Sequence, residues 1–275
     1  MNPKSRIRVI AKYAFYYGFA FIWFVPVLWM TSSAFKPKGE IISFTPQWFP
    51  SVITLENLNA FLAEHDFVLW MTNSAIVAAG ATAVTLVTAT LAAYAFSRIS
   101  WPGRDVVFVI LLTAMFIPWE INAIPLFFIA KDLGLLNTFQ GVFLPISAMP
   151  ISMFLLRQFF ITIPAELEDA ARIDGCGHLG ILRYVIVPVS GPAFAALSIF
   201  IFIFSWNEFF WSLIALRQSD LLTLPIGMKT LVAADNIQYD TLMAGSFLAS
   251  LPSLAVFAIL RRQIISGISM VGVGK

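Results

Sequence analysis

The sequence has little charge and almost no cysteine or histidine. Only 12% of its 275 residues are charged, and 59% are hydrophobic. Soluble globular domains carry about 25% charged residues. The single cysteine, Cys176, excludes an internal disulfide framework and a multi-cysteine metal site. His65 and His178 lie far apart and belong to no metal-binding motif. A net charge of +2 is too small to indicate nucleic-acid binding. The composition predicts an integral membrane protein without a metal centre or a nucleic-acid partner.

Long uncharged runs predict six transmembrane helices, because about 20 apolar residues are needed to cross a hydrocarbon core of roughly 30 Å. The predicted spans are residues 13–35, 67–97, 105–122, 139–160, 184–213 and 241–260. They predict an all-α membrane protein with a single domain over residues 1–275. The first run is longer than the apolar core of a typical signal peptide, and no small-residue cleavage motif precedes Lys36. We therefore interpret it as a retained helix.

The third span is interrupted near Pro118 and Pro125. A membrane helix tolerates a proline break where the freed backbone groups contact protein or water. The prolines therefore predict a break that is buried in the bundle or lies beside a cavity. Residues 126–138, which follow it, are interpreted as a short interfacial piece.

The basic residues predict the orientation in the membrane. Six spans place both termini on one side, and twelve of the 17 lysines and arginines fall on that side, among them Arg98 and Arg157. Lysine and arginine are enriched in cytoplasmic loops. The distribution therefore predicts cytoplasmic termini and a cytoplasmic segment at residues 163–183.

That segment is the most polar part of the chain. Its charged and titratable residues are Glu166, Glu168, Asp169, Arg172, Asp174, His178 and Arg183. Small and apolar residues recur between them at helical spacing, and Gly175 provides a permissive backbone for a turn between two short helices. The residues alone fit either a solvated amphipathic loop or a docking site for a partner.

The order of residues 165–188 resembles the EAA loop of permease subunits in bacterial ATP-binding-cassette (ABC) importers. The matching residues are Asp169, Ala170, Ala171, Gly175, Val187 and Pro188. Two more stretches resemble the carbohydrate-uptake branch of that family: SWNEFFW at residues 205–211, and RRQIISGISMVGVGK at residues 261–275. Two positions depart from the pattern, because Asp169 stands where glutamate is usual and Cys176 where alanine is usual.

The resemblance implies the transmembrane domain of a type I ABC importer in the bacterial cytoplasmic (inner) membrane. Its cytoplasmic coupling helices would lie between the fourth and fifth spans, in the loop at residues 163–183. The implied ATPase-coupling residues are Glu168, Asp169, Ala170, Ala171, Arg172, Asp174, Gly175 and Pro188. The C-terminal tail is implied to contact the ATPase dimer as well.

The resemblance also implies partners. These are a second permease subunit with six or more spans, two ABC ATPase subunits, an extracytoplasmic solute-binding protein and membrane lipid. The sequence contains no GxxxxGK[ST] phosphate loop. We therefore expect this chain to bind no cofactor and to have no ATPase site, so that ATP and Mg are used by the partner ATPases.

Polar side chains at membrane depth are candidates for a substrate pathway, because lipid offers them no partner. The candidates are Asn73, Glu120, Asn122, Trp206, Asn207 and Glu208. Amide and carboxylate groups could bind the hydroxyls of a neutral sugar, and the Trp206 ring could pack on its apolar face. Alternatively, these residues form hydrogen bonds between helices and hold the bundle together.

Two other functions stay open at this stage. Permeases for glycerol 3-phosphate or related phosphodiesters resemble sugar permeases, although the near absence of lysine and arginine in the spans favours a neutral solute. The chain could also be an intramembrane enzyme or a channel. An intramembrane protease needs paired aspartates, or a nucleophile with a base, and neither is visible in the spans.

Overall fold

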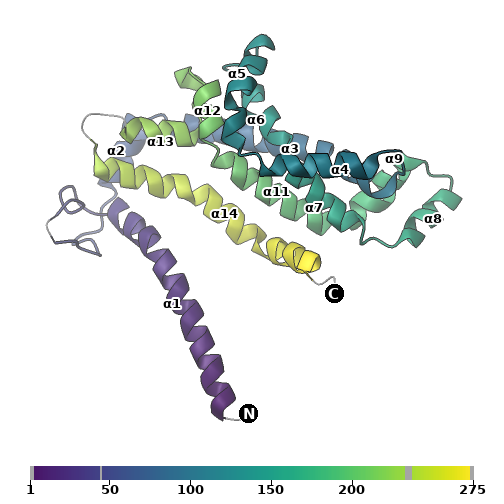
Figure 1. The fold of residues 1–275 in the computed structure, drawn as a ribbon. Helices are drawn as coiled ribbons and strands as arrows, with labels where there is room; N and C mark the ends of the chain where they lie inside the picture. Colours follow the sequence, from purple (N-terminus) through teal and green to yellow (C-terminus); the bar gives the residue numbers. More distant parts are fainter. Residues whose placement is uncertain (1–2, 44, 233–236, 273–275) are drawn as a thin grey trace. The chain divides into compact units, whose positions relative to one another are not determined.

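The computed structural model describes residues 3–43, 45–232 and 237–272, which form helices and loops without a strand (Figure 1). The helices are α1 (Pro3–Ala34), α2 (Glu56–Glu64), α3 (Phe67–Arg98), α4 (Arg104–Thr113), α5 (Ala123–Asp132), α6 (Phe139–Ser147), α7 (Pro150–Phe160), α8 (Ala165–Ile173), α9 (His178–Ile181), α10 (Val187–Val189), α11 (Gly191–Trp206), α12 (Phe210–Ala215), α13 (Leu224–Val232) and α14 (Tyr239–Gly272). The helical architecture confirms the predicted fold class. The end of the C-terminal tail, residues 273–275, lies outside the described residues.

The chain divides into two compact units. The first comprises residues 1–67 and 227–251, and the second comprises residues 68–226 and 252–275. The expectation of a single domain stays a prediction.

Aromatic side chains hold the first unit together. Phe35 packs edge to face on Phe247 of α14, and Phe61 of α2 packs in the same way on Phe67, with 5.3 Å between the ring centres in both pairs. A Cβ atom at Gly245 would lie 2.6 Å from the Phe61 ring. The absence of a side chain at Gly245 therefore lets α14 approach α2 closely.

Lys36 anchors the loop that follows α1, and its side chain is buried. Its Nζ donates to the carbonyl of Gln47 at 2.5 Å and lies 3.9 Å from the centre of the Trp29 ring. Burial lowers the pKa of Lys36, and the negative charge of Glu40 opposes that change. Asn57 of α2 donates to the Lys36 carbonyl. This loop is therefore folded against the end of α1.

The second unit contains a continuous apolar core around α3. Ala78, Ala81 and Ala93 of α3 are fully buried. A Cβ atom at Gly80 would lie 2.8 Å from the ring of Phe143 in α6, which is closer than carbon atoms approach one another. Small residues on one face of α3 thus permit the close helix packing that membrane proteins use in place of hydrophobic burial from water.

Three helical stretches of the second unit are bent. The axis turns by 98° between Arg104–Phe116 and Trp119–Asp132, by 45° between α6 and α7, and by 80° between His178–Val189 and α11. A proline lies at each break. Pro118 lies between Phe116 and Trp119, Pro150 starts α7, and Pro192 lies at the start of α11. Proline lacks an amide donor and clashes with the preceding turn, so it favours these sites.

Three uninterrupted helical stretches among the described residues, 9–34, 67–98 and 239–259, are long and apolar enough to span a membrane. With each bent pair counted as one span, the total is six. The predicted span 67–97 agrees with α3 within one residue. The predicted span 139–160 begins where α6 begins and ends where α7 ends, but the helix is interrupted at Ala148 and Met149.

Two predicted spans differ more from the structure. Within residues 105–122 the helix ends at Phe116 and the chain turns near Pro118, where an interruption was predicted. The predicted interfacial piece, residues 126–138, includes most of α5, which is the second half of this bent pair. Residues 184–213 begin inside a helical stretch that starts at His178, and this stretch bends at Ser190 before α11. Apolar composition predicts the extent of a run but not a bend within it.

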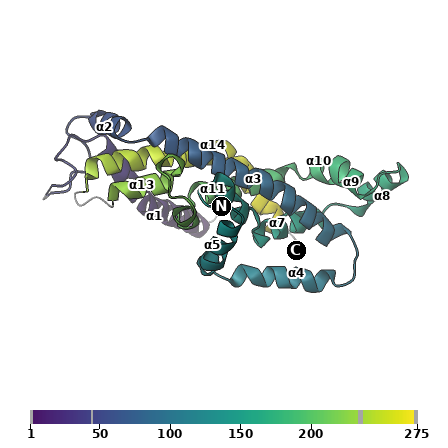
Figure 2. The ribbon, with the colours of Figure 1, turned by 90° about the horizontal axis from the view of Figure 1, so that it is seen from above.

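The predicted coupling segment and the break near Pro118 lie at different ends of the second unit. In both views α8 and α9 extend at one end of this unit, and α5 lies toward the other end (Figures 1 and 2). The segment that resembles the EAA loop is therefore well separated from the break at Pro118.

Candidate functional site

The predicted coupling loop forms two short helices, α8 and α9. Pro164 precedes α8, Glu166 and Glu168 lie in its first turn and Arg172 lies in its last turn. This order suits the helix dipole, which favours negative charge at the N-terminus and positive charge at the C-terminus. The sequence thus specifies both the start of α8 and its direction.

Gly175 ends α8 in the manner expected. Its φ angle is +84°, and the Cys176 amide donates to the Ala171 carbonyl while the Gly175 amide donates to the Arg172 carbonyl. These two bonds define a Schellman motif, in which a left-handed residue follows the helix. An L-residue with a side chain is strained in that conformation. The turn between α8 and α9 therefore depends on glycine.

One face of α8 and α9 is open. Two apolar side chains are largely exposed, Ile173 at 87% and Leu179 at 76%. Ile173 and Leu179 were not in the predicted coupling set, of which six residues are exposed as well: Asp169, Ala170, Arg172, Asp174, Gly175 and Pro188. Exposed apolar side chains in a polar segment are available for burial by a docked protein, as in the core of a protein–protein interface.

The opposite face of α8 is turned inward. Glu168 is only 4% exposed and Ala171 is buried as well, three residues further along the helix. The Glu168 carboxylate forms an ion pair with Arg98 at the end of α3, with 2.8 Å between Oε1 and Nε. Within this chain, the Glu168 carboxylate therefore faces α3.

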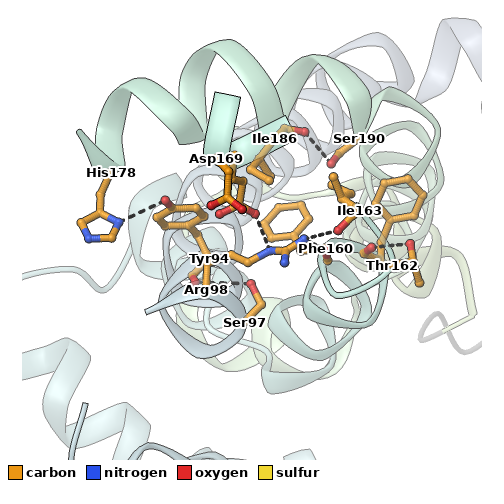
Figure 3. Close-up of polar contacts among 12 residues, drawn as sticks. Tyr94, Ser97, Arg98, Phe160, Thr162, Ile163, Asp169, His178, Ile186 and Ser190 are labelled. Atoms are coloured by element: carbon orange, nitrogen blue, oxygen red, sulfur yellow. Dashed lines mark hydrogen bonds and ion pairs between the residues drawn. The ribbon is translucent and has the colours of Figure 1, made fainter. Parts of the chain in front are cut away.

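Polar contacts join α9 to α3 as well. The Tyr94 hydroxyl of α3 lies 3.2 Å from His178 Nδ1 of α9 (Figure 3). The α8–α9 segment is consequently attached to the last turns of α3 at two points, Tyr94 and Arg98.

A second candidate site is a cavity of about 1020 Å³ in the second unit. Its lining is mostly aromatic and aliphatic and is contributed by α7, α11 and the segments next to them; it includes Trp119, Phe159, Phe200, Phe204 and Phe209. Three of the predicted pathway residues also line it, namely Glu120, Asn207 and Glu208. The break after Pro118 thus lies beside a cavity, as predicted.

Glu208 is committed to the backbone that follows it. Its carboxylate accepts hydrogen bonds from the Trp211 amide at 2.7 Å, the Ser212 amide at 2.8 Å and the Ser212 hydroxyl. The first amides of a helix have no partner within the helix, and a carboxylate satisfies them. Glu208 therefore fixes the start of α12 at the cavity wall.

The remaining predicted pathway residues lie elsewhere or are packed. Trp206 is buried and stacks on Phe202, with 5.8 Å between the ring centres. Asn73 of α3 donates to the carbonyls of Asp220 and Leu222. Neither Trp206, Asn73 nor Asn122 is among the residues that line the cavity. Asn73 thus joins α3 to residues 220–222, in line with the packing alternative considered from sequence, whereas the Trp206 stack lies within α11 itself.

Sequence reasoning missed two arginines with structural contacts in the second unit. It treated Arg98 and Arg157 as topology signals, whereas both donate to main-chain carbonyls of a neighbouring helix. A basic residue at the end of an apolar run was the only sign available. That sign does not distinguish an arginine in water from one that caps another helix.

Comparison with known families identifies this arrangement. Residues 85–268 match the family described as binding-protein-dependent transport system inner membrane component. The chain belongs to this family. It is accordingly a multi-pass membrane permease subunit, and such subunits work with a partner permease, an ATPase and a binding protein.

Relatives extend the similarity over nearly the whole permease. It is 35% identical to the arabinooligosaccharides transport system permease protein AraQ of Halalkalibacterium halodurans, over 98% of this chain and 99% of the relative. It is 33% identical to the diacetylchitobiose uptake system permease protein DasC of Streptomyces coelicolor, over 89% of each chain.

A solved structure has the same fold. It belongs to a bacterial ABC transporter involved in the import of the acidic polysaccharide alginate. The TM-score is 0.85 at 23% sequence identity, and the match covers 95% of this permease and 98% of that chain. The likeness supports the importer transmembrane fold.

Proposed function

We propose that this permease is a subunit of an ATP-driven sugar importer, that it forms half of the translocation pathway, and that α8 receives the force of the partner ATPases. The exposed face of α8 is the observation that carries the proposal. Ile173 and Leu179 are open to solvent beside a polar segment, while the other face of α8 is attached to α3. A helix that is exposed on one side and anchored on the other can transmit a push.

The orientation follows from charge. The excess of lysine and arginine on the side of the termini supports cytoplasmic termini and a cytoplasmic α8. The loops at residues 36–66 and 217–240 then face outward, where a solute-binding protein would deliver the substrate. The permease itself would bind no cofactor, and ATP with Mg would be bound by the partner ATPases.

The cavity supports a neutral sugar as the substrate. Aromatic rings suit the apolar faces of a sugar, and the amide of Asn207 and the carboxylate of Glu120 suit its hydroxyls. Relatives of similar length are named for arabinooligosaccharides and diacetylchitobiose. Among the described residues that line the cavity there is no lysine or arginine. This composition favours a neutral solute over glycerol 3-phosphate, whose negative charge would call for a cation.

Transport would proceed by alternating access. Closure of the ATPases pushes on α8, the helices joined to it move as a group, and the cavity changes the side to which it opens. The bent helices beside the cavity could act as hinges in this change. The uninterrupted helix α3 could act as a rigid lever.

The coupling proposal is tested with the whole importer, comprising this chain, the second permease, the ATPases and the binding protein, in proteoliposomes. Ile173→Asp places a charge on the exposed apolar position, and we expect ATP-dependent uptake to fall more than about tenfold, since an interface centre carries most of the binding energy. Glu166→Gln changes another exposed residue of α8 and serves as the control. Unchanged uptake by Ile173→Asp would contradict the proposal.

The substrate proposal is tested with labelled lactose, diacetylchitobiose, arabinooligosaccharides and glycerol 3-phosphate. We expect a neutral saccharide to be taken up and glycerol 3-phosphate to be ignored. Asn207→Ala should then raise the concentration needed for half-maximal uptake, because a hydrogen bond to the sugar is lost. If Asn207→Ala left the transport kinetics unaltered, contact between Asn207 and substrate would be rejected.

A further inference from the structure

Arg98 holds three groups from two different segments. Its Nη2 donates to the carbonyls of Phe160 and Ile163, both at 2.6 Å (Figure 3). Its Nε lies 2.8 Å from the carboxylate of Glu168. Phe160 is the last residue of α7, and Glu168 lies in the first turn of α8. A single planar guanidinium at the end of α3 thus fixes both the end of α7 and the start of α8.

A second arginine repeats the contact in the opposite direction. Arg157 of α7 donates to the Phe96 carbonyl of α3 at 3.1 Å, and its guanidinium lies 4.1 Å from the centre of the Phe108 ring in α4. The last carbonyls of a helix lack partners within it. Here each of α3 and α7 supplies an arginine that satisfies terminal carbonyls of the other, so the ends of the two helices form one assembly.

The far end of α3 is attached to another loop. The Asn73 amide donates to the carbonyls of Asp220 and Leu222 at 2.9 Å each, and the Ser74 hydroxyl accepts from the Leu224 amide at 2.8 Å. Asn73 and Ser74 are almost completely buried. These contacts hold the segment between α12 and α13 against the start of α3.

Between its two ends α3 is continuous. Among the described residues of the second unit it is the one uninterrupted helix of membrane length, whereas the other spanning stretches there are broken by bends of 45° to 98°. The roughly 25 residues from Asn73 to Arg98 correspond to about 37 Å of helix. A continuous helix moves as a rigid body, so a displacement at Arg98 reaches Asn73 without being absorbed at a hinge.

We propose that Arg98 is a positioning residue that attaches α8 to α3, and that α3 carries the movement of α8 to residues 219–224 at the other face of the membrane. This inference rests on the proposed function of α8 as the contact for the ATPase. In this proposal Glu168 does not contact the ATPase directly. Its carboxylate faces Arg98 and links α8 to α3.

The first test measures solute taken up per ATP hydrolysed by the whole importer in proteoliposomes with its binding protein. Glu168→Gln removes the charge from the ion pair, and Asn73→Ala removes the contacts at the other end. Both should lower uptake per ATP about tenfold while the ATPase still co-purifies with the permease, since coupling between distant sites amounts to roughly 5- to 150-fold. Arg98→Lys, which keeps the charge but not the planar fork, should lie between Glu168→Gln and the unaltered chain.

Matched controls lie beside the two contacts. Asp105→Asn removes the carboxylate of an exposed ion pair with Arg104, and Thr72→Val removes a hydroxyl that bonds only within α3. Both should leave uptake per ATP unchanged. If Glu168→Gln and Asn73→Ala lowered uptake and ATP hydrolysis in parallel, at an unchanged ratio, the residues would be purely structural and the proposal would be overturned.

A second readout follows the movement directly. With Cys176 replaced by serine, a cysteine at the exposed Ser219 is labelled with a membrane-impermeant maleimide before and after ATP is added. We expect the labelling rate to depend on ATP in the otherwise unaltered chain and to lose this dependence with Glu168→Gln. Persistence of the ATP dependence in Glu168→Gln would contradict the lever. Failure of the ATPase to co-purify with any form of the chain would instead contradict the proposed function.

Discussion

The two ends of α3 hold their neighbours by different chemistry. At one end, Arg98 uses a buried ion pair and two bonds to carbonyls, so charge on both sides of the contact is required. At the other end, Asn73 and Ser74 use neutral groups and bond to main-chain groups of residues 220–224. A buried charge that loses its partner costs more than a neutral group that loses a hydrogen bond. The α8 end should therefore be the more sensitive to substitution.

The largest effect is expected for Arg98→Leu. It leaves the Glu168 carboxylate buried without a partner, and we expect a loss of about 3–5 kcal/mol in the free energy of unfolding. Reversible denaturation of the solubilised permease measures this. Leucine at both Arg98 and Glu168 should recover part of the loss, because no buried charge remains. A double variant that is less stable than Arg98→Leu would show that the ion pair is not the source of the effect.

A smaller effect is expected at the neutral end. Asn73→Leu leaves the carbonyls of Asp220 and Leu222 without their donor, at a cost of about 1–3 kcal/mol. The same denaturation experiment applies, with Thr72→Val as the control that leaves the free energy of unfolding nearly unchanged. An effect of Asn73→Leu larger than that of Arg98→Leu would reverse the comparison between the two ends.

The smallest effect is expected in the turn after α8. Gly175→Ala forces a side chain into a left-handed conformation, with a cost of about 1–2 kcal/mol. Gly177, two residues later, has a φ of −77° and no atom near a Cβ position, so Gly177→Ala is the matched control and should be nearly neutral. Equal stabilities of the two alanine variants would mean that the backbone at Gly175 does not limit the turn.

The sequence predicted those parts that depend on local patterns. The uncharged run that became α3 was found within one residue, and Gly175 was expected at the turn between two short helices because glycine alone fits such a backbone readily. The break near Pro118 was predicted to be buried in the bundle or to lie beside a cavity, since a proline-broken membrane helix must find protein or water, and it lies beside a cavity.

The other parts depend on contacts between distant residues. Helical spacing shows that α8 has two faces but not which face meets α3, so the inward position of Glu168 could not be predicted. Arg98 and Arg157 bond to main-chain carbonyls, which are the same for every residue type and leave no pattern in the sequence. Likewise, Glu208 was a candidate for substrate contact, and only the structure reveals that its oxygens accept from Trp211 and Ser212.

The central claim is that the exposed face of α8 contacts the ATPase. The most direct measurement replaces Ile173 with the photo-crosslinking residue p-benzoylphenylalanine in the assembled importer and identifies the crosslinked product. The same substitution at Phe116, which is exposed to the same 87% but belongs to the bend between α4 and α5, is the control. We predict a crosslink to the ATPase from position 173 and none from position 116. No crosslink from position 173, or equal yields from the two positions, would contradict the account.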